Sequence, residues 1–221
     1  MHRERYLTGL LFFVFLLLAV TAIKPYDRAT WLMEVAPVLI AIPVLMLTYR
    51  RLPLTTLLYT LIFLHAIVLI TGGAYTYARV PLGFWMQEIF SFSRNHYDRI
   101  GHFFQGFVPA LAAREILARN GYVTNRRMLG FLCICVAMAI SAWYELIEWA
   151  AALILGQAAD EFLGTQGDPW DTQWDMFMCF VGSVTAMLTL SRLQDRQMKS
   201  MVRTDLQSFL SGRSNDDVNS S

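Results

Sequence analysis

Residues 6–23 read YLTGLLFFVFLLLAVTAI, an apolar stretch without a charged side chain. At about 18 residues it is close to the roughly 20 that a helix needs to cross a hydrocarbon core about 30 Å thick. It follows a short basic start, it is longer than the apolar part of a typical secretory signal, and no small-residue cleavage motif precedes Lys24. The stretch therefore predicts a retained first membrane span.

Five further apolar segments follow, approximately at 31–49, 53–71, 100–117, 128–155 and 171–191. The 221 residues are 56% hydrophobic and 14% aromatic, with a mean hydropathy of +0.42, which is too apolar for an ordinary soluble domain. The sequence therefore predicts an all-α, polytopic transmembrane helix bundle with about six spans. Residues 1–200 would form this membrane domain, and residues 201–221 an amphipathic to disordered cytoplasmic tail.

Basic residues concentrate in every second loop. The net charge is only +1, so no overall field favours nucleic acid, and what matters is where the charges lie. Because Lys and Arg gather in the cytoplasmic loops of membrane proteins, we expect both termini in the cytoplasm. The basic loops hold Arg3, Arg5, Arg50, Arg51, Arg114, Arg119, Arg126, Arg127, Arg192, Arg196, Lys199 and Arg203, and the opposite loops hold Lys24, Arg28, Arg79, Arg94 and Arg99.

The two longer loops of the opposite, outward side have distinct compositions. Residues 72–99 are rich in Tyr, Phe and Trp, which suits a re-entrant or interfacial segment at headgroup level. Residues 156–170 contain three acidic side chains and the helix breakers Gly164, Gly167 and Pro169. We expect this second loop to fold over a site at the outward end.

Ionisable residues occur in pairs at helical spacing, always at this same end of an apolar segment. Spacings of three or four residues place both members of a pair on one face of a helix. Three helices would then present ionisable pairs at one height in the membrane. The pairs are Asp98 and His102, Glu145 and Glu148, and Asp171 and Asp175.

Glu145 and Glu148 lie one turn apart and should repel each other unless a cation or a partner holds them. Arg99 or Arg94 could be that partner, which would make the cluster a purely structural network. A divalent metal is the alternative, because carboxylates on facing bundle helices with one imidazole suit Mg, Mn, Fe or Zn. Spacing alone does not choose between the two.

The metal interpretation assigns a role to each side chain. Its ligands would be His102, Glu145, Glu148 and Asp171, holding one divalent ion of unspecified identity. Asp98 and Asp175 would orient ligands or move protons, and so would be the catalytic candidates. Further candidates at the same end are Asp168, Gln173 and Arg99.

Three stretches carry a resemblance to a known family. They are YDRIGHFFQGF at 97–107, WYELIEW at 143–149 and GTQGDPWDTQWDM at 164–176. Through them the chain resembles the YjdF family of bacterial inner-membrane proteins over residues 5–200. The resemblance implies a multi-pass protein of the bacterial inner membrane and no defined reaction. The short pattern D-x-x-x-H-F, with an Asp-rich helix start later on, is also similar to VanZ-like proteins linked to glycopeptide tolerance, which implies envelope chemistry.

These observations favour an integral membrane protein with an outward-facing acidic site that binds a cation and acts on, or recognises, a lipid or envelope headgroup. Membrane lipids are then the expected partners. A transporter that binds protons or cations on buried carboxylates is the first alternative. A structural membrane protein whose polar cluster locks helices together is the second. Whether the chain is an enzyme stays open at this point.

Overall fold

A computed structural model describes residues 2–155, 166–201 and 203, and within this part every regular element is helical. Residues 156–165 of the predicted loop 156–170, and most of the predicted tail, lie outside the described residues. The elements are α1 (His2–Ile23), α2 (Arg28–Thr48), α3 (Thr56–Tyr75), the 3-10 turn η1 (Tyr77–Arg79), α4 (Pro81–Phe90), α5 (Tyr97–Arg119), α6 (Arg126–Leu155), α8 (Asp171–Thr189) and a last helix, Ser191–Met201.

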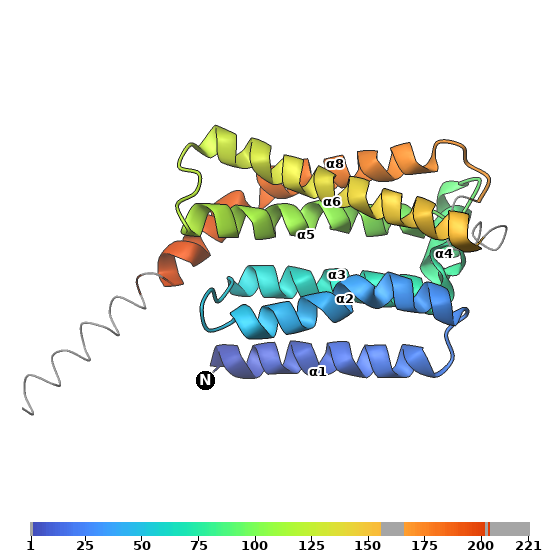
Figure 1. Cartoon of the computed structure of the whole chain (residues 1–221), viewed down its shortest axis with the longest axis horizontal. Coiled ribbons are helices and arrows are strands. Elements are labelled where there is room, and N and C mark those ends of the chain that lie inside the picture. The colour runs from blue at the N-terminus through green and yellow to red at the C-terminus, as the bar shows by residue number, and fades with distance from the viewer. Residues whose placement is uncertain (1, 156–165, 202, 204–221) are drawn as a thin grey trace, which may run out of the picture.

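The long helices run side by side in two layers, α1 to α3 in one and α5, α6 and α8 in the other (Figure 1). Helix α5 is central to the second layer, because it packs against both α6 and α8 and also against α3 of the first layer. The short helix α4 lies at the end of the bundle opposite the N-terminus (Figure 1). This α4 end carries the beginnings of α2, α5 and α8, so polar residues early in these helices come together there.

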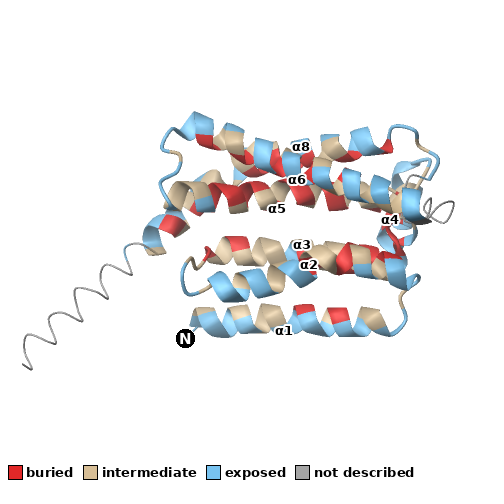
Figure 2. Ribbon diagram, viewed as in Figure 1, coloured by how far each residue is buried: buried red, intermediate tan, exposed pale blue. Residues whose placement is uncertain are grey.

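The prediction of an all-helical, multi-span fold is confirmed. By length and composition, α1, α2, α3 and α6 can each cross a membrane. Helix α8 and Ser191–Met201, with a 58° bend between them, add a fifth if the pair forms one span. Helix α5 is not among these candidates, so a sixth span there stays a prediction, as does the cytoplasmic location of the termini. Exposed apolar side chains cover the outer faces of the helices, while buried residues line the inner ones (Figure 2).

The helix ends differ from the predicted spans by a few residues, for local reasons. Helix α3 begins at Thr56, after Pro53, because the side chain of Thr55 accepts a hydrogen bond from Leu58 N–H and caps the helix. Helix α5 begins at Tyr97, before the apolar stretch, so that Asp98 lies in its first turn. Segment 72–99 contains η1 and α4, and α4 exposes Phe84, Trp85, Ile89 and Phe90; its interfacial position stays a prediction.

Two glycines bring the backbones of α5 and α8 into direct contact. A Cβ atom added at Gly106 would lie 1.8 Å from the carbonyl oxygen of Cys179, and one added at Gly182 would lie 2.0 Å from that of Phe103. Small residues at helix crossings permit this close approach in membrane bundles. Because Gly106 is one turn along α5 from His102, and Cys179 is one turn along α8 from Asp175, the crossing sets the distance between those two side chains.

Candidate functional site

His102, on the second turn of α5, lies between two carboxylates. Its Nε2 atom is 3.5 Å from Oδ1 of Asp98, on the preceding turn of the same helix, and 3.9 Å from Oδ2 of Asp175 on α8. One oxygen or nitrogen atom from each of these three residues lies within 4.8 Å of the other two. Lengths of this order leave room for a cation between the atoms.

The other ring nitrogen of His102 is held by an amide. Nδ1 is 3.0 Å from Oε1 of the buried Gln105, one turn further along α5. An amide oxygen only accepts hydrogen bonds, so Nδ1 carries the proton, and in a neutral ring Nε2 then carries a lone pair. This lone pair faces Asp98 and Asp175. Three groups rich in lone pairs therefore converge on one point, an arrangement that a proton or a metal ion between them would stabilise.

Two carboxylate oxygens beside His102 have no hydrogen-bond partner among the described residues. They are Oδ1 of Asp175 and Oε1 of Glu145, in side chains that are 3% and 8% exposed. Oε1 of Glu145 lies 3.8 Å from Nδ1 of His102, which is beyond hydrogen-bond length. A buried charge without partners is costly, so each of these carboxyl groups requires a proton or a nearby cation.

Glu34 is a further acidic residue at this end, and the sequence analysis did not select it. It is almost fully buried in α2 and accepts a hydrogen bond of 3.1 Å from the hydroxyl of Tyr144 on α6. This bond joins the two layers. A single glutamate inside the apolar segment 31–49 was the signal that could have found it, because ionisable residues within a span are rare and face the protein interior.

Arg94 and Arg99 form ion pairs with Asp168 and Asp171. Arg94 contacts Asp171 and lies 3.2 Å from Oδ2 of Asp168, while Arg99 lies 3.4 Å from the same oxygen of Asp168 and stacks over the ring of Trp174 at 5.0 Å. This arginine network is partly exposed. It includes Asp171 and Asp168, whereas Asp98, Glu145 and Asp175 lie around His102, so the cluster that was predicted as one set is divided in two.

The structure thus brings together Asp98, His102, Glu145 and Asp175. Glu148 is half-buried beside them and lines the adjoining cavity. Asp171, Asp168 and Arg99 lie in the arginine network. Gln173 is exposed on α8. Gln105 and Tyr144, like Glu34, were not among the predicted site residues, because their importance depends on which groups they face.

A cavity of about 740 Å³ adjoins the cluster and extends between the two layers. Glu34, Asp98, His102, Gln105, Tyr144 and Glu148 line its polar end, and mostly aliphatic side chains of α1, α2, α3 and α5 line the rest. Tyr77 of η1 also faces it, and burial, together with the nearby Glu34, raises the pKa of Tyr77 well above its ordinary value. This phenol therefore stays a neutral hydroxyl at physiological pH.

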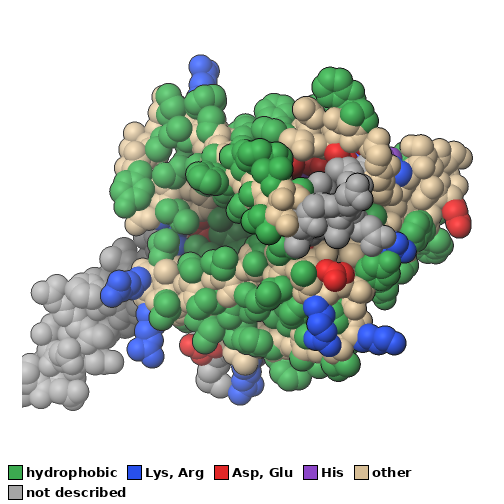
Figure 3. All heavy atoms as spheres, turned by 45° about the vertical axis from the view of Figure 1, so that its right-hand side comes forward, with side chains coloured by type: hydrophobic (Ala, Val, Ile, Leu, Met, Phe, Trp, Pro, Cys, Tyr) green, Lys and Arg blue, Asp and Glu red, His purple; other side chains and the backbone are tan. Residues whose placement is uncertain are grey.

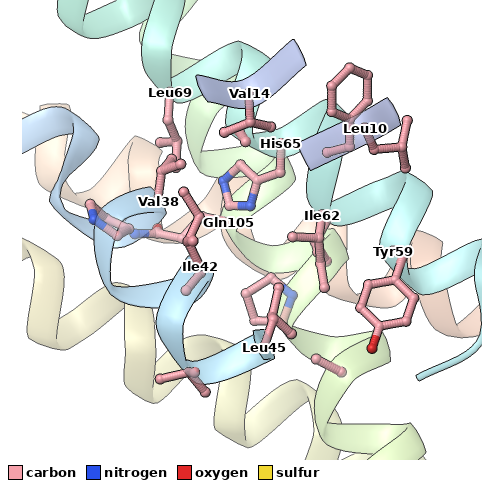
Figure 4. Close-up of a pocket in the computed structure, with 18 of the residues that line it drawn as sticks. Leu10, Val14, Val38, Ile42, Leu45, Tyr59, Ile62, His65, Leu69 and Gln105 are labelled. Atoms are coloured by element: carbon pink, nitrogen blue, oxygen red, sulfur yellow. The ribbon is translucent and has the colours of Figure 1, made fainter. Parts of the chain in front are cut away.

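His65 is the polar exception in the middle of the cavity. Figure 4 shows its ring among Val38, Ile42, Ile62 and Leu69, with Gln105 nearby. Its ring stacks against Phe104 with 6.1 Å between ring centres, and its Nε2 atom has no hydrogen-bond partner among the described residues. Such a nitrogen can accept a hydrogen bond from a group inside the cavity.

Comparison with known proteins agrees with this architecture. The chain matches the family model described as "Predicted membrane protein (DUF2238)" over residues 6–196. It is 61% identical over 184 residues to "Inner membrane protein YjdF" of Escherichia coli (strain K12), a match that covers 83% of this chain and 88% of that protein. No solved structure gives a significant match. Together with the apolar helices, these matches show a multi-pass protein of the bacterial inner membrane that belongs to the DUF2238 family, to which the YjdF protein is closely similar.

Proposed function

We propose that this protein binds a divalent cation at His102 and its neighbouring carboxylates, and through the cation recognises or acts on the headgroup of a membrane lipid. The observation that carries the proposal is the set of three facing groups, Nε2 of His102 with one oxygen each of Asp98 and Asp175. The unpartnered oxygens of Asp175 and Glu145 support it.

The balance of charge supports a cation at this position. Three carboxylates lie within 4 Å of the His102 ring, and the nearby arginines are engaged with Asp168 and Asp171. Even a protonated imidazole would supply only one positive charge against the three carboxylates. A divalent ion would remove most of the imbalance, and ligands of this type suit Zn, Mn or Fe.

The geometry favours roles that differ from those in the sequence analysis. Asp98 and Asp175 are the best-placed ligands beside His102, rather than groups acting from further out. Gln105 would orient the imidazole by accepting its Nδ1–H, as partners of metal-binding histidines commonly do. Glu145 lies 3.8 Å from Nδ1, on the side of the ring away from Nε2, so it would add negative charge beside the ion rather than bind it.

Metal analysis tests the proposal. The protein would be purified in detergent without chelator, exposed to Zn²⁺ or Mn²⁺, desalted and measured by plasma mass spectrometry, and we expect about one ion per chain. Asp175→Asn should lower this occupancy strongly. Asp27→Asn is the matched control, because it removes a carboxylate that caps α2 while asparagine caps equally well.

The alternative functions predict other results. If a protonated His102 only locks the helices together, the wild type will retain no metal, and Asp175→Asn will lower the melting temperature instead. That outcome would refute the cation site. Equal metal content in wild type and Asp175→Asn would also refute it, because the bound ion would then lie elsewhere.

A further inference from the structure

We infer that the cavity between the two layers holds one hydrocarbon chain of a phosphate-bearing membrane lipid, whose phosphate lies at the His102 end. The position of the phosphate rests on the proposed function, because carboxylates repel an anion unless a cation bridges them. The binding of the hydrocarbon chain does not rest on the proposed function, since it follows from the size, lining and opening of the cavity.

The lining changes from polar to apolar along the cavity. Most of the ionisable lining residues gather at the α4 end, and Glu4, Thr8, Tyr49 and Tyr59 line the opposite end. Between the two ends, apart from His65, the walls are formed by apolar side chains such as Val14, Val38, Ile42 and Leu69 (Figure 4). A space with so few hydrogen-bond donors and acceptors holds water poorly, because a buried water needs two to four polar partners. Hydrocarbon is the filling that suits these walls, and the surrounding bilayer supplies it.

The length of the cavity suits a single long chain. On α2 its lining runs from Glu34 to Tyr49, which is about 22 Å at 1.5 Å per residue. One leaflet contributes about 15 Å, half of a hydrocarbon core about 30 Å thick. A lipid whose headgroup lies at His102 can therefore extend its hydrocarbon chain inside the cavity across the whole leaflet and past the bilayer midplane. The volume of about 740 Å³ falls within the range of pockets that enclose small ligands.

The cavity opens sideways toward the lipid. The layers pack against each other mainly through α3 and α5, and α2 and α6, which the Glu34–Tyr144 hydrogen bond joins at the polar end, form the two edges of the opening. Lining residues at these edges, Val44 and Met46 of α2 and Ile140 of α6, are exposed. Figure 3 shows the surface hollowed between the apolar side chains of the two layers. A lipid could thus enter with its tail from the bilayer and its head along the α4 end.

The test is the lipid content of the purified protein. Native mass spectrometry of the wild type should show one lipid per chain, and fragmentation should show a phosphate headgroup. The mass of the bound lipid distinguishes the two lipids that would fit, a two-chain phospholipid with one tail in the cavity and a single-chain lipid phosphate. Ala41→Phe on α2 and Ala112→Phe on α5 place a ring in the cavity, and each should reduce the retained lipid by about tenfold.

Ala139→Phe is the matched control, since Ala139 is exposed on α6 and does not line the cavity. It should retain lipid as the wild type does. Equal lipid content in all four proteins, or no lipid in the wild type, would overturn the inference. Metal content separates the two proposals: protein with metal but no lipid refutes the chain site alone, and protein with lipid but no metal refutes the cation site alone.

Discussion

Gly106→Ala should be strongly destabilising, because its added methyl group would collide with the backbone of α8. The Cβ atom would lie 1.8 Å from the carbonyl oxygen of Cys179, whereas real Cβ atoms essentially never come within 3.0 Å of such an atom. The two helices would have to separate by about 1.2 Å along the most extensive helix contact in the fold. Overpacking of this kind costs about 1 to 3 kcal/mol or more.

Gly130→Ala is the control, because a Cβ atom at Gly130 of α6 meets no atom within 4 Å. There alanine should be neutral or stabilise the helix by up to about 1 kcal/mol. In a protein of this size 1 kcal/mol changes the melting temperature by about 2 to 4 °C, so Gly106→Ala should melt about 2 to 12 °C below the wild type in detergent. It should also bind the proposed metal less well, because His102 and Asp175 would move apart. A melting temperature for Gly106→Ala equal to that of Gly130→Ala would refute the reasoning.

Three further predictions concern topology, the arginine network and a helix cap. Reporter fusions after Arg51 and after Arg196 should show a cytoplasmic location and a fusion near Arg94 the opposite side; an exported signal after Arg196 would contradict the charge argument. Asp171→Asn should lower the melting temperature by weakening its contact with Arg94, yet leave metal content unchanged, and a loss of metal would return Asp171 to the ligand set. Asp27→Ala should cost about 1 kcal/mol, because Asp27 caps α2. Hydrogen bonds from Thr30 lower the pKa of Asp27, so the cap contributes above the carboxyl's ordinary pKa of 3.8 and is lost as pH falls below it; acid melts of wild type and Asp27→Ala should therefore converge.

Much of the fold could be predicted from the sequence, because an apolar segment of this length must satisfy its backbone hydrogen bonds within the bilayer, which a helix does. That His102 lies near Asp175 and Glu145 could also be predicted, since helical spacing and a common depth in the membrane limit where these side chains can lie. Which carboxylate each arginine contacts could not be predicted from the sequence. Arg94 lies on a loop, and its choice of Asp171 over Glu145 depends on the path of that loop.

The cavity and Glu34 could not be derived from spacing alone. A cavity results from how two layers approach, here mainly through α3 and α5, and no single segment encodes it. Glu34 has no ionisable neighbour one turn away on α2, so a search for pairs passes over it. Its partner, Tyr144, lies on a different layer, and only the assembled bundle brings the two together.

The hydrogen bond between Glu34 and Tyr144 also has a consequence for synthesis of the chain. Tyr144 follows Glu34 by 110 residues. At a rate of about 5 to 20 residues per second, α2 is complete some 5 to 20 s before its partner residue exists. During that interval α2 must remain in the membrane on the strength of its own apolar residues, with an acidic side chain that costs about 3 kcal/mol at the centre of a span and less near its end. This link between the two layers therefore cannot form before α6 has been synthesised, whereas the packing of α3 against α5 can begin earlier.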